Sequence, residues 1–235
     1  SSTEGIGLTP EQLQGDQVAS LAVPECGTKF VRGMLEDSRP QTFSDLVRIS
    51  GFSHGTNVWL DNAQDLIKNG TCKLNEAIST RDDVMNFLIH RGMDRKHSFF
   101  VMENVRKGKG IEKRNKQGQA ITEFEAEMRE NNIPEWFIES CKKISYLFPR
   151  AHAVAYVMMA FRIAWFKVYH PLAFYAAYFS IRAKAFDLRI MTGDLKTQMT
   201  EFNRIKALDR GASPKDKDLM SALEVSMEMY QRGYR

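Results

Sequence analysis

Apolar residues recur at intervals of three and four along most of the chain, which is the spacing of one face of an α-helix. Many of these blocks open on a capping residue that is followed three positions later by an acid or amide, as in Thr42 with Asp45 and Thr80 with Asp83. Several close on a glycine: Gly51, Gly70, Gly92, Gly108 and Gly233. We expect helices that begin at Thr9, Thr28, Thr42, Asp61, Thr80, Ser98, Thr122, Pro134, Ala151, Leu172 and Ser213.

Only residues 18–23 alternate enough to suggest a strand, and that signal is weak. The helix from Ala151 should end near Tyr169, because Pro171 has no amide hydrogen and disfavours the helical conformation at His170. The pattern therefore predicts a mostly α fold of many helices with little or no β-structure.

The segment 142–182 combines aromatic rings with positive charge. It holds eight aromatic residues between Tyr146 and Phe174, and seven basic residues lie between residues 142 and 184. Asp187 is the only acid between residues 140 and 193. Rings beside cations suit a polyanion that carries flat bases, so nucleic acid or a nucleotide is the first hypothesis. The alternative is that most of these apolar residues are core, as helical spacing usually implies.

Charge is segregated along the chain although the net charge is only +4. Residues 1–80 carry 6 basic and 10 acidic side chains, and residues 81–120 carry 10 and 5. Residues 121–140 carry 1 and 6, residues 141–191 carry 8 and 1, and the remaining residues carry 8 and 7. Two basic blocks around an acidic one indicate a surface with a positive side.

Length and composition limit the class of protein. A chain of 235 residues with 43% hydrophobic and 26% charged residues is typical of one large or two small soluble domains. The longest uncharged apolar run, residues 153–161, is shorter than a membrane span, and the first 15 residues do not resemble a signal peptide. Three isolated cysteines argue against a disulfide framework and a structural zinc site. We expect a cytoplasmic location and no membrane partner.

Few motifs suggest chemistry. Asp216 and Asp218 have the spacing of a magnesium-binding pair, but they stand in the first turn of a predicted helix, where acids are favoured for structural reasons. The sequence 106–110, RKGKG, predicts a basic loop that a phosphate backbone can approach closely. His54 lies in a predicted turn without an identifiable partner. Phosphate-binding loops, nucleophile motifs and metal-spaced histidines are absent, so no metal or catalytic residue is predicted in this chain.

Several blocks resemble the PolC-type alpha subunit family of bacterial DNA polymerase III, which comprises C-family replicative polymerases. They are TFSDLVRISGFSHGTNVWL from residue 42, VRKGKG from residue 105 and FPRAHAVAY from residue 148. The family usually has Lys at the position of Arg150, and a shorter link in place of residues 112–120.

The resemblance implies the fingers of a DNA-directed DNA polymerase, with a helical fingers domain over residues 1–191 and a helical extension over residues 192–235. A flexible basic loop is expected near residues 106–120. The implied partners are primer-template DNA, deoxynucleoside triphosphates and the palm and other domains of the same polymerase; a sliding clamp would bind only outside this chain. The palm would supply the catalytic aspartates and magnesium, so the chain alone should be inactive.

The pattern of charges and rings, together with the family resemblance, gives candidate binding residues. Arg150 and His152 are expected to face the triphosphate and Tyr156 the base, from the start of one helix. Arg81 and Arg91, at opposite ends of another helix, are further candidates for phosphate or template. DNA-binding candidates are Arg106, Lys107, Lys109, Lys142 and Lys143. In the alternative, His152 and Tyr156 are core residues.

Two other functions fit the charge pattern. One is a free-standing helical module that binds nucleic acid, and the other is a helical scaffold whose basic face binds an acidic protein. Salt-dependent DNA binding separates the first two functions from the third. Template-directed selection of nucleotides separates polymerase fingers from the free-standing module.

Overall fold

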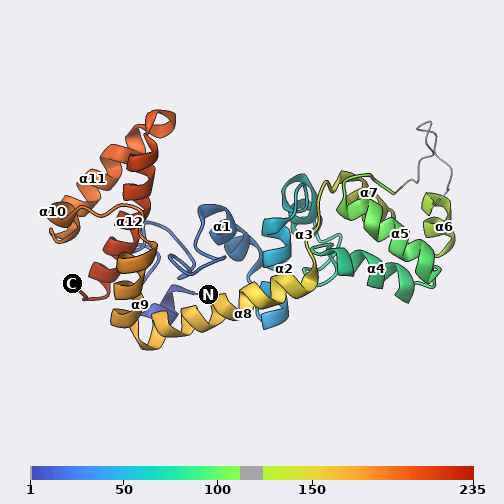
Figure 1. Cartoon of the computed structure of the whole chain (residues 1–235), viewed down its shortest axis with the longest axis horizontal. Coiled ribbons are helices and arrows are strands. Elements are labelled where there is room, and N and C mark those ends of the chain that lie inside the picture. Colours follow the sequence, from blue (N-terminus) through green and yellow to red (C-terminus); the bar gives the residue numbers. More distant parts are fainter. Residues whose placement is uncertain (1, 112–123) are drawn as a thin grey trace. The chain divides into compact units, whose positions relative to one another are not determined.

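A computed structural model describes residues 2–111 and 124–235 of the chain (Figure 1). Within these ranges the chain forms twelve α-helices joined by short turns, and no sheet. The only β-type pairings there are two isolated bridges, Ser2 with Val18 and Thr56 with Tyr146. The predicted mostly α fold is confirmed, whereas the weak strand predicted over residues 18–23 is wrong.

The chain divides into two compact units. Unit 1 comprises Ser1–Glu36 and Met159–Arg235, and unit 2 comprises Asp37–Met158. The second division falls inside helix α8 (Arg150–Tyr169), so the first turns of that helix belong to unit 2 and its last turns to unit 1. Neither division between the units falls at the predicted domain boundary between residues 191 and 192. That boundary stays a prediction.

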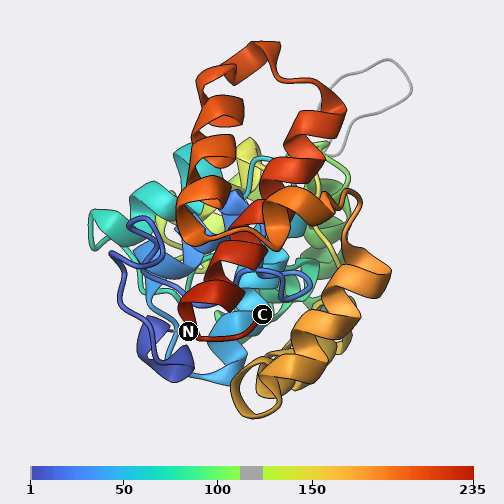
Figure 2. The same cartoon turned by 90° about the vertical axis from the view of Figure 1, so that its left-hand side faces the viewer.

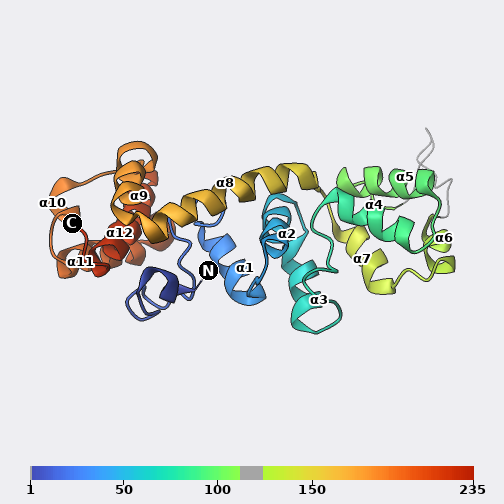
Figure 3. The same ribbon diagram turned by 90° about the horizontal axis from the view of Figure 1, so that it is seen from below.

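The described residues of unit 2 contain six complete helices, and side-chain caps fix the starts of α2, α4 and α5. Capping boxes are present at Thr42 with Asp45 and at Thr80 with Asp83, as predicted. Helices α4 and α5 lie side by side (Figure 3). The helices are α2 (Phe43–His54), α3 (Gln64–Lys68), α4 (Arg81–His90), α5 (Arg95–Arg106), α6 (Phe124–Glu130) and α7 (Glu135–Lys143).

Three predicted helix limits in unit 2 are wrong. Helix α2 continues through Gly51 to His54, and a Cβ atom at Gly51 would lie 2.7 Å from the Ser79 carbonyl oxygen. Gly51 therefore permits a close backbone approach rather than ending the helix. Helix α5 begins at Arg95 because the Asp94 carboxylate accepts the first amide hydrogens, and Ser98 is buried within the helix. Asp61 has a left-handed conformation in the turn before α3.

The cap predicted at Thr122 lies outside the described residues; the helix that follows it is α6.

Unit 1 contains α1 (Lys29–Ser38, mostly in this unit), the end of α8, and the four helices that follow it. Helices α11 and α12 pack side by side (Figure 2). Ser213 and Asp216 form the predicted capping box of α12. The following helices are α9 (Pro171–Ala177), α10 (Leu188–Met191), α11 (Leu195–Ala207) and α12 (Pro214–Gln231).

The sequence reasoning missed α10 and α11, which are capped by the side chains of Asp187 and Asp194. At Thr9 the predicted helix is only a turn, although Thr9 and Gln12 form the mutual hydrogen bonds of a cap.

A buried ion pair lies at the centre of unit 1. Lys167 on α8 and Glu228 on α12 are each 1% exposed, and their charged atoms Nζ and Oε2 are 2.9 Å apart. The Lys167 ammonium also donates to the carbonyl oxygens of Ala19 (2.8 Å) and Leu21 (2.7 Å). The Tyr175 hydroxyl donates to Glu228 Oε1 over 2.7 Å. Burial lowers the pKa of Lys167, and the Glu228 carboxylate opposes that effect.

This pair corrects the charge analysis, in which Lys167 counted toward a positive surface. A buried ammonium that is neutralised by a carboxylate contributes little field outside the protein. Its role is structural, because it joins the N-terminal segment, α8 and α12.

By length and composition alone, α8 is long and apolar enough to cross a membrane, and no other helix in the described residues is. Its longest uncharged apolar run, residues 153–161, is still shorter than a membrane span, because Arg162 and Lys167 interrupt the helix. One face of the helix also packs within the protein, through Ala153, Val157, Ala160 and Lys167. The absence of a membrane partner stays a prediction.

We expect Glu228→Gln to lower the free energy of unfolding by about 3–5 kcal/mol, because it leaves the Lys167 ammonium buried without a counter-charge. Chemical denaturation followed by circular dichroism measures this loss. Glu224→Gln, one turn earlier on α12, is the matched control, since Glu224 only shares Arg32 with Asp16. That variant should cost less than about 1 kcal/mol. Equal losses in the two variants would show that the buried pair has no special weight.

Candidate nucleotide and DNA interface

The first turns of α4 and α8 meet in unit 2. The Arg81 amide donates to the Phe148 carbonyl oxygen over 3.0 Å. In return, the Arg150 amide donates to Asp82 Oδ2 over 2.7 Å. Two helix starts, each with a partial positive charge, therefore lie against each other at this corner. The start of α8 is therefore not wholly free to bind an anion, because Asp82 occupies its first donor.

Two acids and three arginines share this corner. Asp83 Oδ2 accepts from the backbone and hydroxyl groups of Ser79 and Thr80. Asp83 Oδ1 lies 3.5 Å from Arg48 Nη2 and 3.9 Å from Arg150 Nη1. The Arg150 side chain is 43% exposed, so this long contact leaves much of its guanidinium open to solvent. An incoming anion therefore reaches Arg150 more readily than Arg48, whose side chain is 14% exposed.

A cluster of rings follows Arg150 along α8. The ring centroids of His152 and Tyr156 are 4.2 Å apart, and those of Phe148 and His152 are 4.9 Å apart. Tyr156 is 39% exposed, whereas the neighbouring Ala153 and Val157 are buried against Val47 of α2. The predicted grouping of His152 with Tyr156 is therefore present, and Tyr156 lies at the surface.

His54 joins the same cluster, although it is almost 100 residues away in sequence. Its ring centroid lies 5.3 Å from that of Phe148 and 6.0 Å from that of His152. The backbone fixes this approach, because the Thr56 amide donates to the Tyr146 carbonyl oxygen over 3.0 Å. At Gly55, a Cβ atom would lie 2.9 Å from that same oxygen. The sequence named His54 without a partner, and no local signal could have supplied one.

Arg91 does not belong to this corner, because it follows the other end of α4. Its guanidinium lies 5.2 Å from the centroid of the Phe87 ring and donates to the Asn132 carbonyl oxygen over 3.3 Å. The structure thus brings Arg81, Arg150, His152 and Tyr156 together and leaves Arg91 apart.

Most of the predicted DNA-binding cations have intramolecular partners. Arg106 and Lys107 both contact the Glu103 carboxylate, and they hold its pKa down at about 2. Glu139 and Glu125 raise the pKa of Lys142, with N–O distances of 2.8 and 2.9 Å. These contacts reduce the positive charge that each cation presents to a polyanion.

Two cations of this set remain accessible. Lys143 donates to the Asp61 carbonyl oxygen over 2.7 Å, and no ion pair joins it to any described residue. Lys109 is exposed, and no ion pair joins it to any described residue. Residues 112–120 of the predicted flexible loop lie outside the described ranges.

No metal or nucleophile site emerges. The described residues contain no cluster of three or more histidine, cysteine or acidic side chains arranged to hold a metal ion. Asp216 is a capping residue, since its carboxylate accepts from the Ser213 hydroxyl over 2.6 Å, which agrees with the structural role predicted for it. Burial raises the pKa of the Cys26 and Cys72 thiols to about 11, and that of Cys141 further. These thiols are therefore poor nucleophiles.

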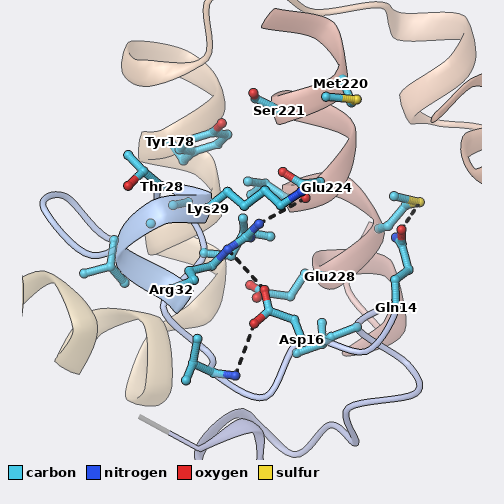
Figure 4. A pocket seen from close by; sticks show the side chains of 18 of the residues that line it. Gln14, Asp16, Thr28, Lys29, Arg32, Tyr178, Met220, Ser221, Glu224 and Glu228 are labelled. Carbon is cyan, nitrogen blue, oxygen red and sulfur yellow. Dashed lines mark hydrogen bonds and ion pairs between the residues drawn. The ribbon is translucent and has the colours of Figure 1, made fainter. Parts of the chain in front are cut away.

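Unit 1 has a separate cavity of about 820 Å³ (Figure 4). Arg32 spans it, with N–O distances of 3.1 Å to Asp16 and 3.3 Å to Glu224. Because Arg32 is paired with these acids, its charge is not available to an anion in the cavity. None of the predicted binding residues lines it.

Comparison with known proteins gives consistent matches. The family described as the bacterial DNA polymerase III alpha subunit finger domain matches residues 12–132. The chain is 54% identical over its full 235 residues to DNA polymerase III PolC-type of Caldanaerobacter subterraneus. It is 51% identical over 232 residues (99% of the chain) to the PolC-type polymerase of Bacillus subtilis, and 53% over 234 (100%) to that of Thermotoga maritima. The chain spans only 15–16% of the length of these relatives.

The exposed position of Tyr156 makes a stability test possible. We expect Tyr156→Ala to lower the free energy of unfolding by no more than about 1 kcal/mol, because much of the ring is already in contact with water. The neighbouring Val157→Ala should cost about 2 kcal/mol, since Val157 is buried. Thermal melts of both variants measure the difference. A larger loss for Tyr156→Ala than for Val157→Ala would make Tyr156 a core residue.

Proposed function

Because the chain belongs to the bacterial DNA polymerase III alpha subunit finger-domain family, we propose that it forms the fingers of a PolC-type replicative DNA polymerase. In this role it binds the incoming deoxynucleoside triphosphate and the primer-template DNA. The observation that carries the proposal is the placement of exposed Arg150 beside the ring cluster of His152 and Tyr156. The family match favours this function over the free-standing module and over the scaffold for an acidic protein.

The corner of α4 and α8 suits a triphosphate. Phosphoryl transfer depends mainly on positioning and on stabilisation of negative charge. Arg150 supplies a planar set of donors that matches phosphate oxygens, and Arg81 lies at the adjoining helix start. Since Arg150 is 3.9 Å from Asp83, a phosphate can replace that weak contact without disrupting the capping bonds of Asp83.

The ring cluster suits the base. Tyr156 is exposed and supported from behind by His152, so its ring offers a flat surface to a base pair. His152 is then placed between phosphate and base, one turn from Tyr156. The carboxylates that hold catalytic magnesium would come from the palm, outside this chain, and the chain alone would incorporate no nucleotide.

Template and duplex DNA would be bound by the accessible cations. Lys109 and Lys143 are the strongest candidates, since Arg106, Lys107 and Lys142 share their charge with acids. Arg91 can contact template only from the far end of α4. The proposal places the domain in the cytoplasm, where its three free cysteines stay reduced.

In the intact polymerase, we expect Arg150→Ala to raise the nucleotide KM about ten- to hundredfold, because a charge-assisted contact to phosphate is lost. Steady-state primer extension measures the change. Arg150→Lys should raise the KM less than Arg150→Ala, since it keeps a positive charge that can contact phosphate.

Two further variants control this test. Arg91→Ala removes a similar charge at the other end of α4 and should leave the nucleotide KM unchanged. Tyr156→Ala should lower the rate and alter base selection, whereas Tyr156→Phe keeps the ring and should be mild. An unchanged KM in a folded Arg150→Ala enzyme would remove Arg150 from the nucleotide site.

A second expectation concerns the salt dependence of DNA binding by the chain. Lys109→Gln should reduce the slope of log Kd against log salt by about 0.9, the value for one lost phosphate contact. Glu103→Gln should instead steepen the slope, because it releases the charges of Arg106 and Lys107. Fluorescence anisotropy with duplexes of two unrelated sequences measures both changes. If neither variant alters the slope, Arg106, Lys107 and Lys109 contact water and do not contact DNA.

A further inference from the structure

The last turns of α8 carry a second set of rings and charge, separate from the nucleotide corner. Lys167 points into unit 1, and successive residues of an α-helix are rotated by about 100°. Trp165 and Tyr169, two positions before and after Lys167, therefore lie on the opposite, outer side of the helix. They are 46% and 65% exposed. Arg162, one turn before Trp165, is also exposed.

The rings of this outer face contact one another. The centroids of Trp165 and Tyr169 are 5.2 Å apart with an interplanar angle of 40°, and Trp165 also lies 5.0 Å from His170. Because the Trp165 and Tyr169 rings are tilted and not stacked face to face, neither covers the other. Each can offer a face to another planar group.

The sequence on either side of these rings carries charge of one sign. No acidic residue occurs between residues 140 and 186. Among the described residues no ion pair neutralises Arg162, Arg182 or Lys184, all three of which are exposed on unit 1. Within the part of this segment that belongs to unit 1, from Met159 onward, the cation that does have a counter-ion is Lys167, and it is buried. A partner for the outer face must therefore be acidic or phosphorylated.

We infer that Arg162, Trp165 and Tyr169 form a binding site for single-stranded DNA, in which bases stack on the two rings and Arg162 contacts the phosphate backbone. Stacking on exposed aromatic rings beside a cation is the general way in which proteins bind single strands without sequence preference. The choice of DNA over RNA rests on the proposed function. The geometry of the site is independent of that proposal. Trp, Tyr and Arg also anchor contacts between proteins, so a protein partner is the competing outcome of the test.

The tryptophans of the chain provide a site-specific signal. Trp165 is the most exposed of the three, since Trp59 is 3% exposed and Trp136 is half-buried. Titration of the 235-residue chain with a twenty-residue oligothymidylate should therefore quench tryptophan emission. Trp165→Phe should abolish most of the quenching while keeping binding, because a ring remains. Trp136→Phe is the matched control and should keep the quenching.

Affinity gives the second measurement. Trp165→Ala and Tyr169→Ala should each weaken oligothymidylate binding about ten- to hundredfold, the range for loss of one stacked base. Arg162→Gln should reduce the salt slope by about 0.7, as expected for one phosphate contact on a single strand. Circular dichroism should show unchanged helix content in all three variants. If a variant of the 235-residue chain is unstable, the same substitution is made in the full-length polymerase. Its affinity is then compared with that of the parent polymerase on primer-templates with long and short template overhangs.

Two results would overturn this site. One is quenching that persists in Trp165→Phe, together with unchanged affinity of Trp165→Ala. The other is Trp165 emission that ignores DNA but shifts with protein concentration, which would assign the face to protein contact. The test is independent of the nucleotide corner, because it uses no nucleotide. Loss of oligothymidylate binding with a normal nucleotide KM, or the reverse, tells the two sites apart.

Discussion

The buried pair of Lys167 and Glu228 is the constraint on which unit 1 depends. A buried ammonium is tolerated only when its donors are satisfied, and Lys167 uses three donors on Ala19, Leu21 and Glu228. The Glu228 carboxylate in turn receives the Tyr175 hydroxyl from α9. These bonds tie an irregular N-terminal segment to three helices. They also fix the rotation of α8, and thereby decide that Trp165 and Tyr169 face outward.

In unit 2 the equivalent constraint is a backbone junction. The bonds from Arg81 to Phe148 and from Arg150 to Asp82 hold two helix starts together. Asp82 and Asp83 are largely committed to backbone and hydroxyl donors, so they neutralise the guanidinium of Arg150 only in part. An anion binding there gains a cation that the fold has already positioned, without having to break a capping bond.

Sequence reasoning succeeded where the cause is local and failed where it is tertiary. The capping boxes at Thr42, Thr80 and Ser213 were predictable because donor and acceptor lie within four residues. The role of Gly51 was not, since it depends on Ser79 from another segment. The site shows the same contrast. His152 and Tyr156 are one turn apart on a helix, so their contact was predictable. His54 is placed beside them by the backbone bond from Thr56 to Tyr146, which joins segments far apart in the sequence.

The charge pattern shows why a count of basic residues overstates a binding surface. Of the cations that made residues 141–191 look uniformly positive, Lys167 is buried against Glu228 and Lys142 is shared between Glu125 and Glu139. Glu139 is three residues from Lys142, but Glu125 and Glu228 come from more distant parts of the sequence, which a local window does not reveal. What remains is a cation followed by rings at helical spacing, at Arg150 and again at Arg162. Asp83 approaches the Arg150 guanidinium only to 3.9 Å, and no ion pair joins Arg162 to a described residue. Arg150 with Tyr156, and Arg162 with Trp165, therefore each combine a cation with an aromatic ring. A nucleic acid, as a chain of phosphates and bases, requires both.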